Sequence, residues 1–120
     1  MAKILVVDDE VNWLELCADR LSELGHEVRS TADCAKAYGE IKADPPDVVI
    51  LDLRMPVGGR LMLYALRQDW PQIPVIIHTV YSGYKDDPDL ARVDGFVVKS
   101  PDLSELAAAV DKVLARSRVP

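Results

Sequence analysis

The stretch ILVVDDE, residues Ile4–Glu10, decides the fold of this chain. Its four consecutive apolar residues, followed at once by acidic ones, predict a strand that is buried on both faces, as in a parallel sheet. Similar apolar runs recur at Val48–Leu51, at Val75–Ile77 (ending near Thr79) and at Gly95–Val98. The chain therefore contains several buried strands of the kind that parallel sheets use.

Between these runs the spacing of apolar residues becomes helical. Helices are expected over residues 11–24, 32–42 and 60–68, and a short strand over His26–Ser30. Gly25 is a C′ residue that ends the first helix. Ser100 and Pro101 suit the N-cap and first position of a final helix. Strand and helix alternate five times, which is typical of an open α/β sheet with helices on both faces.

Composition narrows the class of protein. The 120 residues form one domain, expected over 1–117, and residues 118–120 are expected to be a frayed tail or a truncated linker. With 49% apolar and 28% charged residues the chain is too apolar to be disordered. A net charge of −6 argues against a DNA-binding surface. Cys17 and Cys34 form neither a disulfide framework nor a zinc motif, and no targeting or membrane-spanning segment is visible, so we expect a cytoplasmic protein.

Polar residues stand where the buried strands end. They are Asp8 and Asp9, Asp52, Thr79 and Lys99. Ligands of open α/β sheets bind beyond the carboxyl ends of the strands, where these side chains converge if the first and third strands are neighbours. Clustered carboxylates suit Mg²⁺, an ammonium and a hydroxyl suit phosphoryl oxygens, and one carboxylate can act as a nucleophile. The pattern predicts phosphoryl transfer to an aspartate.

Each of these residues also has an ordinary structural interpretation. Asp9 could serve simply as the N-cap of the following helix. Thr79 could be an ordinary loop residue, and Lys99 an ordinary solvent-exposed lysine. The chemical interpretation therefore depends on all four strand ends together.

Four motifs in this order resemble the receiver domain of two-component response regulators, over essentially the whole chain. They are residues 4–10 (ILVVDDE), 49–56 (VILDLRMP), 74–79 (PVIIHT) and 95–99 (GFVVK). The resemblance implies a flavodoxin-like, doubly wound (βα)5 fold with a five-stranded parallel sheet in the order 2-1-3-4-5.

The resemblance also implies roles for the strand-end residues. Asp52 would accept a phosphoryl group, and Lys99 would pair first with Asp52 and then with that group. Mg²⁺ would be bound by Asp52, by Asp9 directly, by Asp8 largely through water, and by the backbone carbonyl of Arg54.

A second implied function is a switch. Thr79 would move to hydrogen-bond the phosphoryl oxygen, and Phe96 would turn into the space that it leaves. In the family this shift alters the face of the fourth helix, fifth strand and fifth helix, where partners dock.

The implied partners follow from the same resemblance. The phosphoryl donor would be a phosphohistidine on a sensor histidine kinase or a histidine phosphotransfer protein. The chain would act on a downstream protein, or through an output domain absent from these residues, and could form a homodimer. It would bind neither nucleic acid nor membrane, and it would not be a turnover enzyme.

Three departures from the family pattern stand out. Val80 follows the switch threonine where a small residue is usual; with Arg54 and Tyr81 it predicts a slowly hydrolysing aspartyl phosphate, unless the backbone carries Val80 aside. Ser100 replaces the proline after Lys99, so a trans bond is expected there. The segment 82–88 is a poor helix sequence, so the fourth helix should start near Pro88 and be short, or be partly disordered.

Other functions remain to be weighed. A phosphate-independent docking module fits the three departures but not the complete set of strand-end residues. A dehalogenase-type phosphatase would need a second Asp two residues after its nucleophile, which neither Asp8 nor Asp52 has. A flavin-binding protein would need a phosphate loop where Asp8, Asp9 and Glu10 stand.

Overall fold

A computed structural model describes residues 2–55, 58–81, 83, 86–90 and 92–117. Five parallel strands form one sheet in the order β2-β1-β3-β4-β5, as predicted. Their bounds are β1 Lys3–Val7, β2 Glu27–Thr31, β3 Val48–Leu51, β4 Val75–Thr79 and β5 Gly95–Val98. Each predicted strand lies within two residues of the observed one. Four of them are uninterrupted apolar runs, which mark strands that are covered on both faces, whereas β2 is a more polar edge strand.

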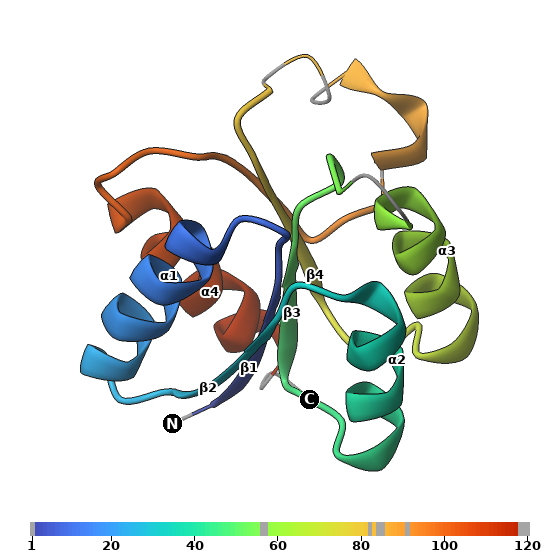
Figure 1. The fold of residues 1–120 in the computed structure, drawn as a ribbon, viewed down its shortest axis with the longest axis horizontal. Coiled ribbons are helices and arrows are strands. Elements are labelled where there is room, and N and C mark those ends of the chain that lie inside the picture. The colour runs from blue at the N-terminus through green and yellow to red at the C-terminus, as the bar shows by residue number, and fades with distance from the viewer. Residues whose placement is uncertain (1, 56–57, 82, 84–85, 91, 118–120) are drawn as a thin grey trace.

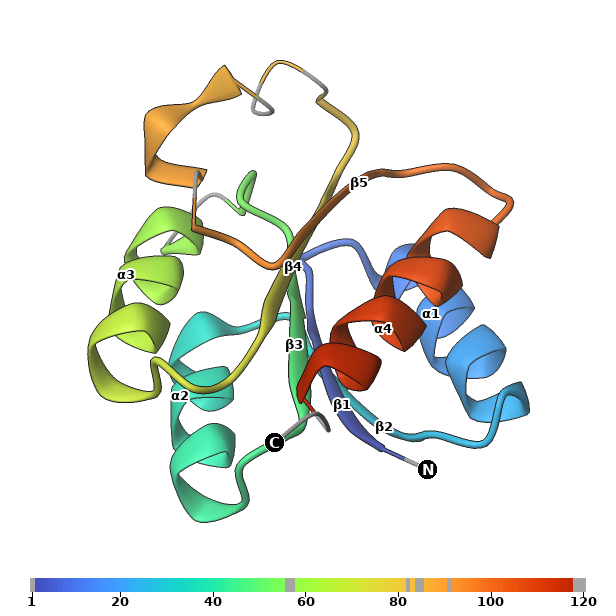
Figure 2. The same cartoon turned by 180° about the vertical axis from the view of Figure 1, so that it is seen from behind.

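Two pairs of helices cover the sheet, one pair on each face (Figure 1; Figure 2). α1 (Val11–Glu23) and α4 (Ser104–Ser117) cover one face, and α2 (Cys34–Ala43) and α3 (Gly59–Asp69) cover the other. None of the helices in the described ranges is long and apolar enough to cross a lipid bilayer. The arrangement is the doubly wound α/β fold that the sequence predicts.

Alternate strand residues enter two separate cores. Ile4 and Val6 of β1 join the core beneath α1 and α4, whereas Leu5 and Val7 join the core beneath α2 and α3. All four are at most 1% exposed. Since successive strand residues point to opposite faces, a four-residue apolar run supplies two residues to each core.

The first helix ends as its glycine predicts. Gly25 has φ +94°, a left-handed conformation that favours glycine. Its N–H donates to Ser22 at 2.9 Å, and the His26 N–H donates to Leu21 at 3.2 Å. These two bonds form a Schellman motif, which reverses the chain directly into β2.

The connection between β4 and β5 has no α-helix in its described part. In its described part the regular structure includes a 3-10 turn, η2, at Pro88–Leu90. The prediction of a short fourth helix that starts near Pro88 is confirmed, and η2 takes the fourth helical position of the (βα)5 pattern. Much of the stretch before it, at 82, 84 and 85, lies outside the described residues.

The final helix begins later than predicted. Its first residue is Ser104, whose N–H donates to the Asp102 carboxylate at 2.9 Å, so Ser100 is not the N-cap. The reason lies upstream: the Lys99 N–H still donates to the Thr79 carbonyl at 2.7 Å, which keeps the chain extended beside β4. The expected trans bond after Lys99 is present, since no cis peptide occurs among the described residues. The predicted tail, 118–120, falls outside those residues.

Candidate functional site

Asp8 and Asp52 lie side by side at the carboxyl edge of the sheet. β1 and β3 are neighbours, with Val7 opposite Leu51, so the residues that follow these two strands meet. The Asp52 N–H extends this pairing by donating to the Val7 carbonyl at 3.0 Å. Both aspartates are buried, with exposures of 2% and 4%. The predicted convergence of these two carboxylates is therefore observed.

Lys99 joins the two aspartates. Its Nζ lies 2.6 Å from Asp8 Oδ2 and 2.9 Å from Asp52 Oδ2, and its side chain is fully buried. Such charge-assisted bonds are short and strong, and they give each of the buried charges a partner. The ammonium is thus fixed beside the carboxylate that the resemblance identifies as the phosphoacceptor.

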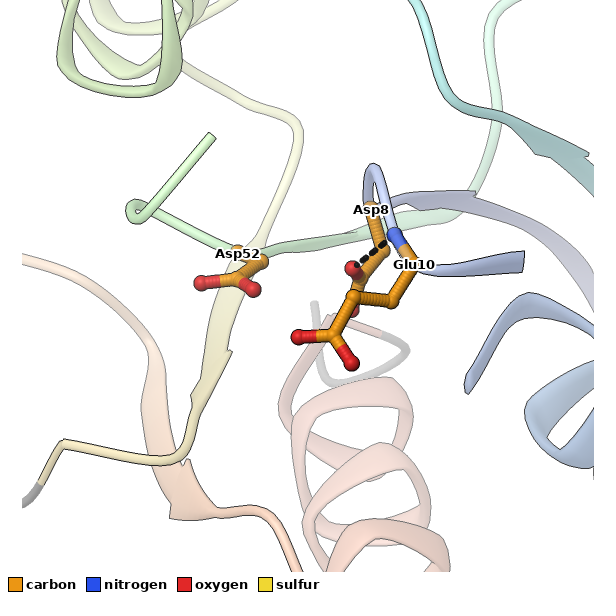
Figure 3. A group of neighbouring side chains, drawn as sticks. All are labelled: Asp8, Glu10 and Asp52. Atoms are coloured by element: carbon orange, nitrogen blue, oxygen red, sulfur yellow. Dashed lines mark hydrogen bonds between the residues drawn. The ribbon is translucent and has the colours of Figure 1, made fainter. Parts of the chain in front are cut away.

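A third carboxylate, that of Glu10, completes the cluster. One oxygen each of Asp8, Glu10 and Asp52 lies within 4.8 Å of the others (Figure 3). The Glu10 N–H also donates to Asp8 Oδ1 at 2.9 Å. Sequence reasoning missed Glu10, although its position directly after the two aspartates was the available signal.

Asp9 takes a different position from these three carboxylates. It is exposed and lines a cavity between α2 and α3 together with Cys34 and Met55, and it is not one of the three clustered residues. Its assignment as a direct Mg²⁺ ligand stays a prediction.

The clustered residues fit a hard divalent cation. When Asp8, Glu10, Asp52 and Lys99 are all ionised, three negative charges face one positive charge. Carboxylate oxygens are the donors that Mg²⁺ prefers. The excess of two negative charges matches the charge of such an ion.

Burial and pairing shift the pKa values of the two central groups. Burial raises the pKa of Asp8, and its hydrogen bonds with Lys99 and the Glu10 N–H only partly oppose this. Burial lowers the pKa of Lys99, but the hydrogen bonds to Asp8 and Asp52 outweigh it and the pKa is raised. Lys99 is therefore held in its charged form.

The loop after Asp52 turns back onto its carboxylate. The Arg54 N–H donates to Asp52 Oδ1 at 2.9 Å, while Lys99 occupies Oδ2. The Arg54 side chain is exposed. Arg54 is thus fixed beside Asp52, and the assignment of the Arg54 carbonyl as a cation ligand stays a prediction.

Thr79 and Phe96 lie on the strands next to the acidic cluster. Thr79 is fully buried, and its Oγ1 accepts a bond from the Tyr81 N–H at 3.4 Å. Phe96 is half-buried, sits opposite Ile77 and packs on the core beneath α2 and α3. Val80 is 51% exposed, so it lies at the surface rather than in the core. The coupled movement of Thr79 and Phe96 remains a prediction, as does the slow hydrolysis.

Two aromatic side chains to which the resemblance assigns no role complete the surroundings of Lys99. The Trp13 ring centroid is 5.2 Å from Lys99 Nζ, and the buried His78 ring lies 5.7 Å from that centroid at an interplanar angle of 85°. Trp13 is half-buried and His78 is buried. Spacing alone gave no sign that both rings lie beside the lysine.

Comparison with known proteins decides the family. The sequence model of the response regulator receiver domain matches residues 4–111. The chain belongs to this family. Its flavodoxin-like fold and its place in two-component systems follow from that membership.

Solved receiver structures superimpose closely on this one. TrrA of Thermotoga maritima, determined in complex with Mg²⁺-BeF, is 35% identical with a TM-score of 0.89, covering 94% of this chain and 99% of TrrA. A second match comes from the structure of the histidine kinase ThkA in complex with TrrA. The matched chain is 36% identical with a TM-score of 0.88, and the match covers 95% of this chain and 99% of the matched chain.

Relatives known from sequence are longer proteins. The probable transcriptional regulator ycf27 of Porphyridium aerugineum is 35% identical over 95% of this chain and 48% of its own length. The response regulator PhoP of Pseudomonas aeruginosa is 30% identical over 96% of this chain and 52% of its own length. This receiver thus spans about half the length of these two relatives.

Proposed function

We propose that this receiver accepts a phosphoryl group on Asp52 from a phosphohistidine and thereby switches a signalling surface. The observation that carries the proposal is the bridge of Lys99 Nζ between Asp52 and Asp8, at 2.9 Å and 2.6 Å. A buried carboxylate beside a fixed ammonium and an acidic cluster is suited to receiving a charged phosphoryl group. The reaction modifies the protein itself, so turnover of a substrate is no part of it.

The transfer exchanges one bond to phosphorus for another. An Asp52 carboxylate oxygen forms the new P–O bond while the P–N bond to the donor imidazole breaks, and the imidazole nitrogen keeps the electron pair. Lys99 then donates to the phosphoryl oxygens. Mg²⁺, held by Asp8 and Asp52 with Asp9 and the Arg54 carbonyl, would neutralise part of the phosphoryl charge when bound. Glu10 lies close enough to add a carboxylate.

The switch would use the contacts that the phosphoryl group gains. Thr79 would exchange its present bond from the Tyr81 N–H, at 3.4 Å, for one to the phosphoryl group. Phe96, half-buried next to β4, would follow. A ligand shifts such an equilibrium only through contacts that differ between the two states.

The donor we propose is a histidine kinase or a histidine phosphotransfer protein in the cytoplasm. Support comes from the complex of TrrA with the histidine kinase ThkA. We also propose that the receiver acts on a downstream protein or through an output domain. Relatives such as ycf27 and PhoP support this, because they extend well beyond the half that matches this chain.

Intact mass measurement tests the acceptor. The protein is incubated with acetyl phosphate and Mg²⁺, alongside the variants Asp52→Ala and Asp111→Asn. We expect the parent and Asp111→Asn, which changes an exposed aspartate of α4, to gain one phosphoryl group, and Asp52→Ala to gain none. No gain from acetyl phosphate or from a phosphohistidine donor would contradict the proposal, and so would an undiminished gain by Asp52→Ala.

A further inference from the structure

The Lys99 ammonium has an aromatic neighbour as well as its carboxylates. Its Nζ lies 5.2 Å from the centroid of the Trp13 ring, within the range at which a cation is attracted to an aromatic face. The Lys99 side chain is fully buried, so this attraction is not weakened by water. The ammonium therefore has two carboxylates and an indole ring around it.

Trp13 is held in place from two directions. Its backbone N–H donates to the Glu10 carbonyl at 3.0 Å, within the first turn of α1, which fixes the Trp13 backbone beside the loop that carries Asp8. Its ring meets that of His78 edge to face at 5.7 Å and packs on the core beneath α1 and α4. The ring thus has a fixed position relative to the acidic cluster.

The sheet register explains why Trp13 reaches Lys99. His78 of β4 sits opposite Val97 of β5, and Val97 enters the core beneath α1 and α4. Lys99 comes two residues after Val97 and so projects to the same face, toward α1. The indole ring consequently lies beside both the strand residue His78 and the ammonium.

We propose that Trp13 is a positioning residue for Lys99, and that its ring confines the ammonium between Asp8 and Asp52 and so speeds phosphorylation of Asp52. The inference rests on the proposed function. A lysine side chain has a flexible four-carbon stem, so its ammonium can take many positions. Glu10, whose side chain is 57% exposed, offers a competing partner, because its Oε1 lies 3.9 Å from Lys99 Nζ. A ring face restricts these alternatives while leaving the ammonium's donors free for oxygen atoms.

Two substitutions of Trp13 separate the aromatic face from simple bulk. Initial rates of phosphorylation by acetyl phosphate and Mg²⁺ are followed by intact mass over hours, so that slow variants are also measured. We expect Trp13→Leu to be about tenfold slower than the parent and Trp13→Phe to stay within about twofold. Trp13→Phe also secures the comparison if Trp13→Leu folds poorly. Equal slowing in the two variants would overturn the inference.

A double-mutant cycle tests whether Trp13 acts through Lys99. In a Lys99→Ala background the change Trp13→Leu should slow the reaction no further, because the ammonium that the ring positions is gone. The same fold loss in both backgrounds would show a merely structural role and overturn the inference. The matched control is Trp70→Leu, since Trp70 packs on Tyr38 and the opposite core, and its rate should equal that of the parent.

Nuclear magnetic resonance supplies a readout that needs no phosphorylation. The Trp13 ring current should move the Lys99 ε-methylene protons upfield in the parent, and this shift should vanish in Trp13→Leu. Absence of the shift in the parent would overturn the inference even if Asp52 is phosphorylated. Conversely, a parent that shows the shift but gains no phosphoryl group would contradict the proposed function and the rate effect, and only the packing of Trp13 on Lys99 would stand.

Discussion

Burial of a neutral histidine makes His78 sensitive to acid. Burial lowers its pKa from 6.5 to about 4, with the nearby Lys99 charge adding to the effect. Between these values the unfolded chain binds the proton more readily than the folded one. The free energy of unfolding should therefore fall as the pH drops through this range, by up to about 3 kcal/mol from this side chain.

Substitution of His78 isolates this contribution. In His78→Phe and His78→Gln the fall in the free energy of unfolding between about pH 7 and pH 4.5 should be smaller than in the parent, as measured by urea unfolding. Packing changes shift stability by a similar amount at every pH, so the two variants should share the flatter profile. The raised pKa of Asp8 acts in the opposite direction and is common to all three proteins. A parent-like slope in both variants would refute the assignment.

Individual site residues were predictable where the strand ends determine their position. Asp8, Asp52 and Lys99 follow buried strands, and parallel pairing brings those ends together whatever the helices do. Trp13 could not be placed in this way, because its contact with Lys99 depends on how α1 lies against the sheet. Residue spacing within a helix does not encode that packing.

Within and next to the helices, replacing glycine by alanine should change the free energy of unfolding in opposite directions at two positions. Gly25 has φ +94°, so Gly25→Ala should lower the free energy of unfolding by about 1 kcal/mol. Gly39 lies inside α2, where a Cβ would meet nothing within 4 Å. Gly39→Ala should raise it by about 0.5–1 kcal/mol, because alanine favours a helix interior. Chemical denaturation of both variants checks the signs, and a gain at Gly25 would contradict the Schellman interpretation.

Helix starts were less predictable than strands, for a physical reason. α2 begins at Cys34 because the Asp33 carboxylate accepts bonds from the N–H groups of Ala35, at 2.8 Å, and Lys36, at 3.2 Å. Several residues near a helix start can serve as its cap, and before α4 the Asp102 carboxylate, rather than Ser100, accepts a bond from the Ser104 N–H. Tertiary bonds decide which one is used.

Across the whole molecule, the acidic cluster ties global stability to divalent cations. The chain carries a net charge of −6, so any salt should stabilise it somewhat by screening. Mg²⁺ should stabilise it further, because a cation bound by the folded state alone adds to the free energy of unfolding by mass action, about 1.4 kcal/mol at ten times the dissociation constant.

Replacing Lys99 should increase the stabilisation by Mg²⁺. Without Mg²⁺, Lys99→Met should be less stable than the parent by about 3 kcal/mol, because Asp8 and Asp52 lose their buried partner. Added MgCl₂ should restore more stability to this variant than to the parent. Urea unfolding in MgCl₂, compared with NaCl of equal ionic strength, measures both effects. Equal stabilisation by the two salts would exclude the cation site.

The turn η2, which stands between β4 and β5 in place of a helix, should affect how this domain opens. β5 borders a single strand, β4, and in its described part the segment that joins them contains a 3-10 turn where the repeating pattern would place a helix. Local unfolding costs least where few groups must separate. Amide hydrogens of β5 should therefore exchange with deuterium sooner than those of the central strand β3. Transient unfolding of β5 would release Lys99 while Asp8 and Asp52 stay together. The ion pairs of Lys99 would therefore be the first contacts of the acidic site to break.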